Sequence, residues 1–177
     1  MAARVLDVFS HVGGFGLATL ASGAMNAICV DGSEAALALA RQGAEASDMR
    51  DRLETRTSDA FDALNELATE DRTFGTVICD PPAFAPAKSA LGAGLRAYEK
   101  VARLSAPLVQ TGGTLTLCSC SHAADLAQFR KACIAGIGRA GRSAQILRTG
   151  FAGPDHPQHP ALAESGYLKA ITFRITE

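Results

Sequence analysis

The stretch that decides the fold is Gly75-Thr76-Val77-Ile78-Cys79-Asp80-Pro81-Pro82-Ala83-Phe84, an apolar run that ends in an acid and two prolines. An apolar run bounded by turn residues is typical of a buried β-strand. Proline fixes φ, donates no backbone hydrogen bond and restricts the residue before it, so the strand should end before Asp80. The five residues from Asp80 to Phe84 then form a rigid ledge. We expect this ledge to carry a carboxylate and a backbone carbonyl into a cleft, where they can hold a flat, polar substrate group beside a cofactor.

Strands and helices alternate along the chain on both sides of the ledge. We expect strands at residues 5–9, 27–30, 54–57, 75–79, 114–118, 144–148 and 168–175, and helices at residues 15–22, 33–46, 61–67, 95–108 and 124–135. This alternation predicts an α/β fold, a mostly parallel Rossmann-like sheet with helices on both faces. Only a loop, residues 149–167, joins the last two strands, so the last strand is expected to run antiparallel. In the second helix, Ser33 is the expected N-cap and Leu39 is expected on the inner face.

Length and composition limit what the chain can be. Its 177 residues suit one domain, 1–177, and 47% hydrophobic against 20% charged residues indicates a globular protein. A net charge of −1 and a pI near 6.4 give no overall basic surface for nucleic acid, which leaves a local basic patch or a separate basic domain. The chain has neither an apolar run of roughly 18 residues nor a signal-peptide pattern, so a cytoplasmic protein without a membrane partner is expected.

The cysteines and histidines lack the spacing of a metal site, and no metal is expected. Five cysteines, an odd number, indicate reduced thiols. His156 and His159 lie between prolines without an acidic or cysteine partner at suitable spacing, so we interpret them as loop-shaping or substrate-facing residues. His122 can assist a thiolate or accept a proton, but a solvent-facing position at a helix start is the simpler interpretation.

A cofactor site is predicted at the carboxyl ends of the first two strands, where doubly wound sheets bind ligands. The turn with Gly13 and Gly14 lets backbone approach a ligand closely. Asp31 ends the second strand and can accept hydrogen bonds from two ribose hydroxyls of NAD or S-adenosylmethionine, or it can be a simple turn residue. Gly13, Gly14 and Gly16 are too crowded for G-x-G-x-x-G, so a pyrophosphate seat is less favoured.

Asp59 follows the third strand and has two interpretations. It can bond an adenine amino group, or it can be the N-cap of the helix that begins before Phe61. A glycine turn, Asp31, Asp59 and the ledge follow one another at four successive strand ends. Their order, more than any one of them, favours a nucleoside-containing cofactor.

A nucleophile is predicted at the end of the fifth strand, in Leu117-Cys118-Ser119-Cys120. Residues two apart in a strand share a face. Cys120 lies just past the strand, where it can face Asp80 across the cleft, whereas Cys118 is more simply a small buried hydrophobe. A thiol there suits methyl transfer to cytosine C5, because thiolate attack at C6 makes C5 nucleophilic. Asp80 can then bond the N3/N4 edge of the cytosine.

The chain resembles the catalytic domain of bacterial large-subunit rRNA cytosine-5 methyltransferases of the RlmI type, which are class I S-adenosylmethionine-dependent enzymes. The resemblance covers nearly the whole chain. Its motifs are Val5-Leu6-Asp7-Val8-Phe9-Ser10 with Gly13-Gly14-Phe15, Val30-Asp31, Asp59-Ala60-Phe61, the ledge, Lys88-Ser89, Ser119-Cys120-Ser121, Asp155-His156-Pro157 and Gly166-Tyr167-Leu168-Lys169.

The resemblance implies a catalytic pair, Cys120 as nucleophile with Asp80, and a cofactor, S-adenosylmethionine. The residues expected to hold that cofactor are Asp7, Phe9, Ser10, Gly13, Gly14, Asp31, Ser33, Asp59, Ala60, Asp80 and Pro81. The chain departs from the family in carrying Ala83 where lysine is usual. It also begins at the first strand, where family members carry an N-terminal PUA domain. We therefore expect RNA, and rRNA in particular, to be the partner, with an additional RNA-binding domain supplying affinity.

Two other functions remain open. A methyltransferase of the same fold can act on a guanine nitrogen, and related enzymes of that kind share the ledge but lack the cysteine, since a nitrogen lone pair needs no covalent activation. Cys120 therefore separates these two hypotheses. The third hypothesis is a non-catalytic, cofactor-binding interaction domain, which would bind cofactor without transferring a methyl group to RNA.

Overall fold

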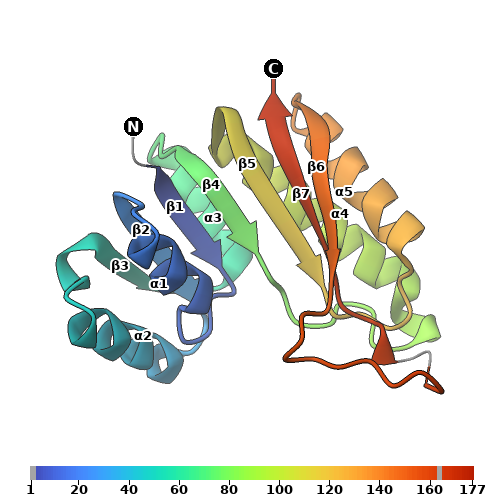
Figure 1. Ribbon diagram of the computed structural model, residues 1–177. Helices are drawn as coiled ribbons and strands as arrows, with labels where there is room; N and C mark the ends of the chain where they lie inside the picture. The colour runs from blue at the N-terminus through green and yellow to red at the C-terminus, as the bar shows by residue number, and fades with distance from the viewer. Residues whose placement is uncertain (1–2, 163–164) are drawn as a thin grey trace.

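Seven strands form one mixed sheet in the order β3-β2-β1-β4-β5-β7-β6 (Figure 1). The computed structural model describes residues 3–162 and 165–177. The strands are β1 (Arg4–Val8), β2 (Asn26–Asp31), β3 (Leu53–Thr57), β4 (Phe74–Cys79), β5 (Val109–Ser119), β6 (Ser143–Phe151) and β7 (Lys169–Thr176). The α-helices are α1 (Gly14–Ala21), α2 (Glu34–Ala46), α3 (Ala60–Thr69), α4 (Leu91–Ser105) and α5 (Leu126–Arg139), with short 3-10 turns at Arg50–Arg52, Lys88–Ala90 and Ala106–Leu108.

The strand directions confirm a mostly parallel sheet with an antiparallel last strand. β1 pairs in parallel with β2 and β4, β2 with β3, and β4 with β5. β7 runs antiparallel to both β5 and β6, so β6 forms the edge. β5 begins at Val109 and not at 114 as predicted, because Gly112 adopts a φ of 82° and the strand continues through a register shift against β4.

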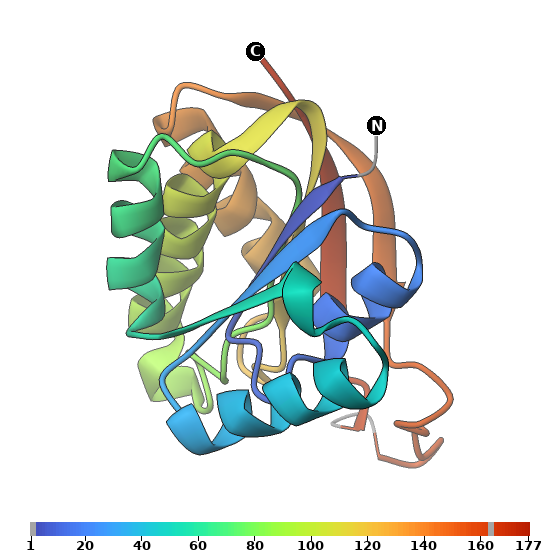
Figure 2. The same cartoon turned by 90° about the vertical axis from the view of Figure 1, so that its left-hand side faces the viewer.

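Helices cover both faces of the sheet, as predicted. α1 and α2 pack on one face over β1, β2 and β3, and α3, α4 and α5 lie on the other (Figures 1 and 2). The larger apolar core lies under α3, α4 and α5 and includes Leu115, Phe129 and Phe173. A smaller core under α1 and α2 includes Leu20 and Ala44.

The start of α2 follows the sequence, but one of its predicted inward residues does not. Ser33 caps the helix, since its Oγ accepts a hydrogen bond from the backbone N–H of Ala36. Leu37 and Ala40 are fully buried, whereas Leu39 is 54% exposed. The prediction for Leu39 was wrong because its side chain projects away from the stripe that Leu37 and Ala40 define at helical spacing.

The parallel arrangement brings five strand ends to one place. The carboxyl ends of β1 to β5 lie along one edge of the sheet, the lower edge in Figure 1, and the segment between β6 and β7 lies there too. Each predicted site residue lies in the last two residues of one of these strands or in the segment that follows it. Within the described residues, no helix combines the length and the apolar character that crossing a membrane requires.

Candidate active site

The turn between β1 and α1 has an unusual backbone. Phe9, His11 and Gly13 have φ values of 61°, 49° and 76°, in the left-handed region that non-glycine residues rarely adopt. At Gly13 a Cβ atom would lie 2.9 Å from the Cβ of Ala40, so α2 packs directly on the turn. Strained backbone of this kind clusters at ligand sites. The turn therefore has the close, rigid backbone that a bound cofactor would contact.

Asp7 lies beneath this turn and is fully buried. Its Oδ2 accepts a hydrogen bond of 2.8 Å from the backbone N–H of Gly16, and its Oδ1 has no partner among the described residues. Desolvation is the main cause that raises the pKa of Asp7 to about 7. The carboxyl thus supports the turn from below, and its role in cofactor binding remains a prediction.

Asp31 joins the turn to the start of α2. Its two carboxylate oxygens accept backbone N–H bonds, each 2.8 Å long, from Ser33 and His11. Each oxygen keeps a second acceptor position, so the carboxylate is fixed and still able to accept from ribose hydroxyls. Ser10 is held nearby, since its backbone N–H donates to the carbonyl of Val30. The ribose role of Asp31 stays a prediction with suitable geometry.

Asp59 is the N-cap of α3, so the capping interpretation of the sequence is confirmed. Its Oδ1 accepts from the backbone N–H groups of Phe61, at 2.8 Å, and Asp62, at 3.3 Å. Capping occupies one oxygen of the carboxylate. The proposed contact between Asp59 and adenine is therefore compatible with capping and remains a prediction, as does that of the buried Ala60.

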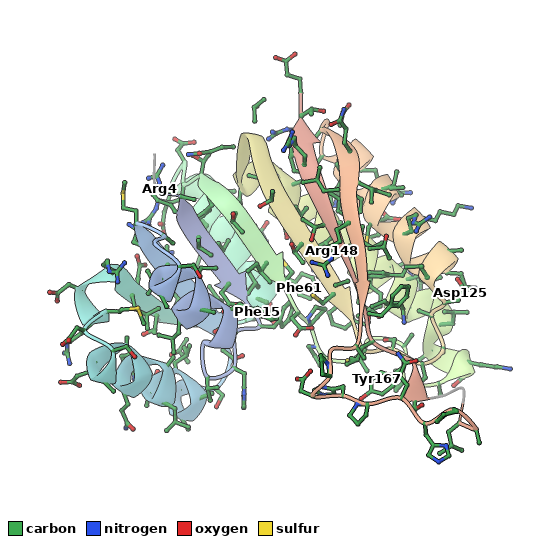
Figure 3. The ribbon with its side chains drawn as sticks, in the orientation of Figure 1. Arg4, Phe15, Phe61, Asp125, Arg148 and Tyr167 are labelled. Carbon is green, nitrogen blue, oxygen red and sulfur yellow. The ribbon has the colours of Figure 1, made fainter. Side chains whose placement is uncertain are left out.

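An aromatic wall stands at the same strand ends, and sequence reasoning missed two of its three members. The ring centroids of Phe84 and Phe9 lie 6.2 Å apart, edge to face, and those of Phe84 and Phe61 lie 6.4 Å apart, stacked. Phe61 belongs to α3, and Figure 3 shows it near the lower end of β4. The available signal was an aromatic residue close after each acid, in Asp59-Ala60-Phe61 and at the end of the ledge.

The ledge is fixed at both of its ends. The backbone N–H of Asp80 donates to the carbonyl of Val8, and that of Ala85 donates to Ser121 Oγ at 2.9 Å. α4 packs against the ledge so tightly that a Cβ atom on Gly94 would lie 2.7 Å from the carbonyl oxygen of Phe84. The Asp80 side chain reaches solvent, and partial desolvation raises its pKa.

Cys120 lies against the ledge. Its Sγ is 3.8 Å from the carbonyl oxygen of Pro81, and the residue is half-buried. The serines on either side, Ser119 and Ser121, hydrogen-bond the hydroxyl of Tyr98 at 2.9 Å and 2.7 Å. Tyr98 comes from α4 and is 2% exposed, so it ties the strand end to the helix layer. The structure thus brings together the thiol and the ledge, the two features that the sequence placed at neighbouring strand ends.

Desolvation and the charge of Asp80 raise the pKa of the Cys120 thiol, while Lys169 acts to lower it. Burial raises the pKa of Cys118 much further. Cys118 lies within the body of β5, opposite Ala170 of β7. The choice of Cys120 over Cys118 as the nucleophile remains a prediction. Cys29, Cys79 and Cys133 are fully buried.

Lys169 ends one of the motifs that carry the resemblance, but sequence reasoning assigned it no role in the site. It is 8% exposed, and its Nζ donates to the carbonyls of Ser121, at 2.9 Å, and Tyr167, at 3.0 Å. No ion pair with an acidic side chain forms at this ammonium within residues 3–162 and 165–177. Burial lowers the pKa of Lys169, and the Cys120 thiolate would raise it. Among the described residues, a buried ammonium with no carboxylate at ion-pair distance therefore lies close to the candidate nucleophile.

The sequence of this chain matches one family profile and is similar to individual curated proteins. A family profile described as conserved hypothetical protein 95 matches residues 1–102. Ribosomal RNA large subunit methyltransferase I of Aeromonas salmonicida is 37% identical over 175 residues, which cover 98% of this chain and 44% of that protein. The enzyme of the same name from Vibrio vulnificus is 35% identical, over 97% of this chain and 44% of that protein. The chain thus spans less than half the length of these curated relatives.

Solved structures resemble it in fold. A candidate S-adenosylmethionine-dependent methyltransferase from Streptococcus mutans superposes with a TM-score of 0.85 at 22% identity, covering 98% of this chain and 44% of that one. SMU.776, a candidate methyltransferase crystallised with S-adenosylhomocysteine, gives 0.84 at 24% identity, with 97% and 45% covered. Together with the strand order, these similarities confirm the class I methyltransferase fold predicted from the sequence.

Proposed function

We propose that the chain is a methyltransferase catalytic domain. It belongs to the conserved hypothetical protein 95 family and is homologous over 98% of its length to a large-subunit rRNA methyltransferase. Its proposed reaction is S-adenosylmethionine-dependent methylation of C5 of a cytosine in rRNA. The observation that carries the proposal is the 3.8 Å approach of Cys120 Sγ to the carbonyl of Pro81, on the ledge that also bears Asp80.

The residues at the ends of β1, β2 and β3 suit the proposed cofactor. Asp31 has a fixed carboxylate with spare acceptor positions for ribose hydroxyls, and the glycine turn offers a close backbone surface. When bound, S-adenosylmethionine supplies an electrophilic methyl group on a sulfonium. Asp80 and Pro81 follow β4, which lies between β1 and β5 in the sheet, so the ledge would hold the base beside the methyl group of the cofactor.

Cys120 would perform the covalent step. Its thiolate donates an electron pair to C6 of the cytosine, which forms a C–S bond and moves the π electrons of the C5–C6 bond into the ring. C5 would then bond to the methyl carbon as the bond between that carbon and the sulfonium sulfur breaks, with S-adenosylhomocysteine as the leaving group. Removal of the C5 proton by a base restores the C5–C6 double bond and breaks the C–S bond, so the thiolate leaves. Each bond that Cys120 forms is broken again within one cycle.

Asp80 and Lys169 would control charge during that step. The Asp80 carboxylate can accept a hydrogen bond from the N4 amino group of the cytosine. Because its pKa is raised, the carboxyl can also share a proton with N3 as negative charge builds on the ring. The ammonium of Lys169 has three donors, of which two bind carbonyls. Its charge opposes the desolvation and the repulsion by Asp80 that raise the pKa of Cys120.

We expect this chain alone to bind the proposed substrate, rRNA, only weakly. Its net charge is −1, so phosphate contacts should contribute little. We propose that a further RNA-binding domain supplies the missing affinity, and that the protein acts in the cytoplasm. The guanine-nitrogen alternative explains the ledge but leaves the position of Cys120 without a purpose.

Product analysis tests the proposal. The purified chain, S-adenosylmethionine and bacterial large-subunit rRNA would be incubated, and the nucleosides identified by mass spectrometry after digestion. We expect 5-methylcytidine with the unchanged chain and with Cys118→Ala, and none with Cys120→Ala. Methylguanosine would support the nitrogen alternative. Cofactor binding measured by calorimetry without any methylated nucleoside would support the interaction-domain alternative.

A further inference from the structure

A hollow with a volume of about 310 Å³ lies among residues that follow Cys120 in the chain and the residues around Lys169. His122, Asp125, Phe151, Tyr167 and Lys169 contribute to its walls. Figure 3 shows Tyr167 at the lower edge of the molecule and Asp125 near the foot of α5, so the hollow opens at the edge that holds the candidate active site. The volume is at the small end of ligand sites, which run from about 300 to 1,000 Å³.

Flat aromatic side chains dominate this hollow. The rings of His122 and Tyr167 are stacked, with centroids 4.2 Å apart and an interplanar angle of 28°. Phe151, at the end of β6, is 63% exposed. Aromatic faces left in contact with water gain free energy when another ring covers them. Proteins that recognise single-stranded RNA use such faces to stack unpaired bases.

Polar groups in the hollow complement the edge of a base. Asp125 caps α5 through Oδ1, which accepts from Gln128 N–H at 2.7 Å, and this leaves the other oxygen as an acceptor. Lys169 lies at the boundary with the active site, because its Nζ binds the carbonyls of both Ser121 and Tyr167. One acceptor and one cationic donor beside aromatic faces can serve a nucleobase.

The hollow is adjacent to the nucleophile. His122 is two residues from Cys120, which limits the distance between their Cα atoms to about 7 Å. The carbonyl of Ser121, between them, is held by Lys169. The nucleotide next to a cytosine bound at Cys120 is therefore within reach of the rings of His122 and Tyr167.

We propose that this hollow is a stacking subsite for the RNA base that flanks the target cytosine, with His122, Tyr167 and Phe151 as its aromatic surface. The inference rests on the proposed function, since it takes RNA as the ligand. It adds a source of affinity that depends on bases and not on phosphates. A chain with a net charge of −1 would then select single-stranded or splayed RNA at this point.

The chain contains no tryptophan, so Tyr167→Trp places a single fluorophore in the subsite. The probes are a single-stranded RNA pentamer with a central cytosine and the same pentamer with abasic flanking positions. We expect saturable quenching by the first and little by the second. Met25→Trp is the matched control, because Met25 is 52% exposed and lies beside Ala3, at the opposite edge of the sheet. Equal quenching by both RNAs, or none up to millimolar RNA, would overturn the subsite.

Binding of the same two RNAs to Tyr167→Ala and Tyr167→Phe completes the test. Tyr167→Ala removes one stacking contact, so its affinity for the base-containing RNA should fall by about 5- to 100-fold, while its affinity for the abasic RNA should not change. Tyr167→Phe keeps the ring, so its affinity for the base-containing RNA should stay within about twofold of that of the unchanged chain. An equal loss for both RNAs would contradict the proposal. Base-dependent binding without 5-methylcytidine formation would uphold the subsite and reject the cytosine-5 chemistry, so the two failures are distinguishable.

Discussion

The two halves of the candidate active site are built differently. At the ends of β2 and β3, Asp31 and Asp59 are held by backbone N–H groups, most of them two or three residues away. At the ends of β4 and β5, Cys120 is surrounded by groups from distant parts of the chain, such as Lys169, which contacts Ser121 across 48 residues. The first half is a rigid binding surface, while the second collects buried and partly buried groups whose charge state matters to chemistry.

The buried carboxyl of Asp7 is the exception in the first half, and it gives the largest expected effect. Its pKa is about 7 in the folded chain against an ordinary value of 3.8, so the folded state holds this proton more tightly than the unfolded state. Its contribution to stability is therefore present below pH 4 and is lost as pH rises to about 7. We expect Asp7→Asn to raise the free energy of unfolding by about 2–4 kcal/mol at pH 7.5, and by little at pH 4.

Urea unfolding of Asp7→Asn at both pH values measures this effect. Asp51→Asn, at an exposed position in the 3-10 turn Arg50–Arg52, is the matched control and should show no such difference. A stabilisation that is the same at pH 4 and pH 7.5 would mean that burial does not perturb the Asp7 carboxyl.

Asp31 tests whether the first half binds the cofactor. Asp31→Ala should weaken S-adenosylmethionine binding by about 1.5–3 kcal/mol, the usual effect of losing a charged hydrogen-bond acceptor. Isothermal titration calorimetry measures it, with Asp51→Ala as the control and a melting curve to check the fold. Unchanged affinity in folded Asp31→Ala would remove this residue from the cofactor site.

Lys169 tests whether the second half controls charge. Lys169 acts to lower the pKa of Cys120, so without its ammonium that pKa should rise and alkylation of Cys120 near pH 8 should slow in Lys169→Met. Asp80→Asn should lower the pKa of Cys120 and speed its alkylation, because the charge of Asp80 raises that pKa. Peptide mass spectrometry after iodoacetamide treatment gives the rates, and Lys131→Met on α5 is the exposed control. Identical profiles for Lys169→Met and the unchanged chain would exclude the proposed role.

RNA binding by the chain alone should show the smallest effect. We expect weak binding that declines further between about 50 and 200 mM salt, because few phosphates are neutralised by a chain of net charge −1. Gel-shift titrations at both salt concentrations measure it. Tight binding at the higher salt would contradict this expectation and make a separate RNA-binding domain unnecessary.

The same contrast explains what the sequence could predict. Strand alternation, the reversed last strand, the Ser33 cap and the position of Cys120 at the ledge follow from local patterns and from the rule that parallel strands end together. Tyr98, which binds serines more than 20 residues away, and Lys169 could not be found this way. No periodicity links residues that meet only when α4 and β7 pack beside β5.

Covalent trapping tests the central claim, that Cys120 is the nucleophile, most directly. The chain would be incubated with S-adenosylmethionine and large-subunit rRNA transcribed with 5-fluorocytidine, whose C5 fluorine blocks the release of the thiolate. After nuclease digestion, intact-protein mass spectrometry should show a nucleotide adduct on the unchanged chain and on Cys118→Ala, and none on Cys120→Ala. An adduct that persists in Cys120→Ala and disappears in Cys118→Ala would contradict the account.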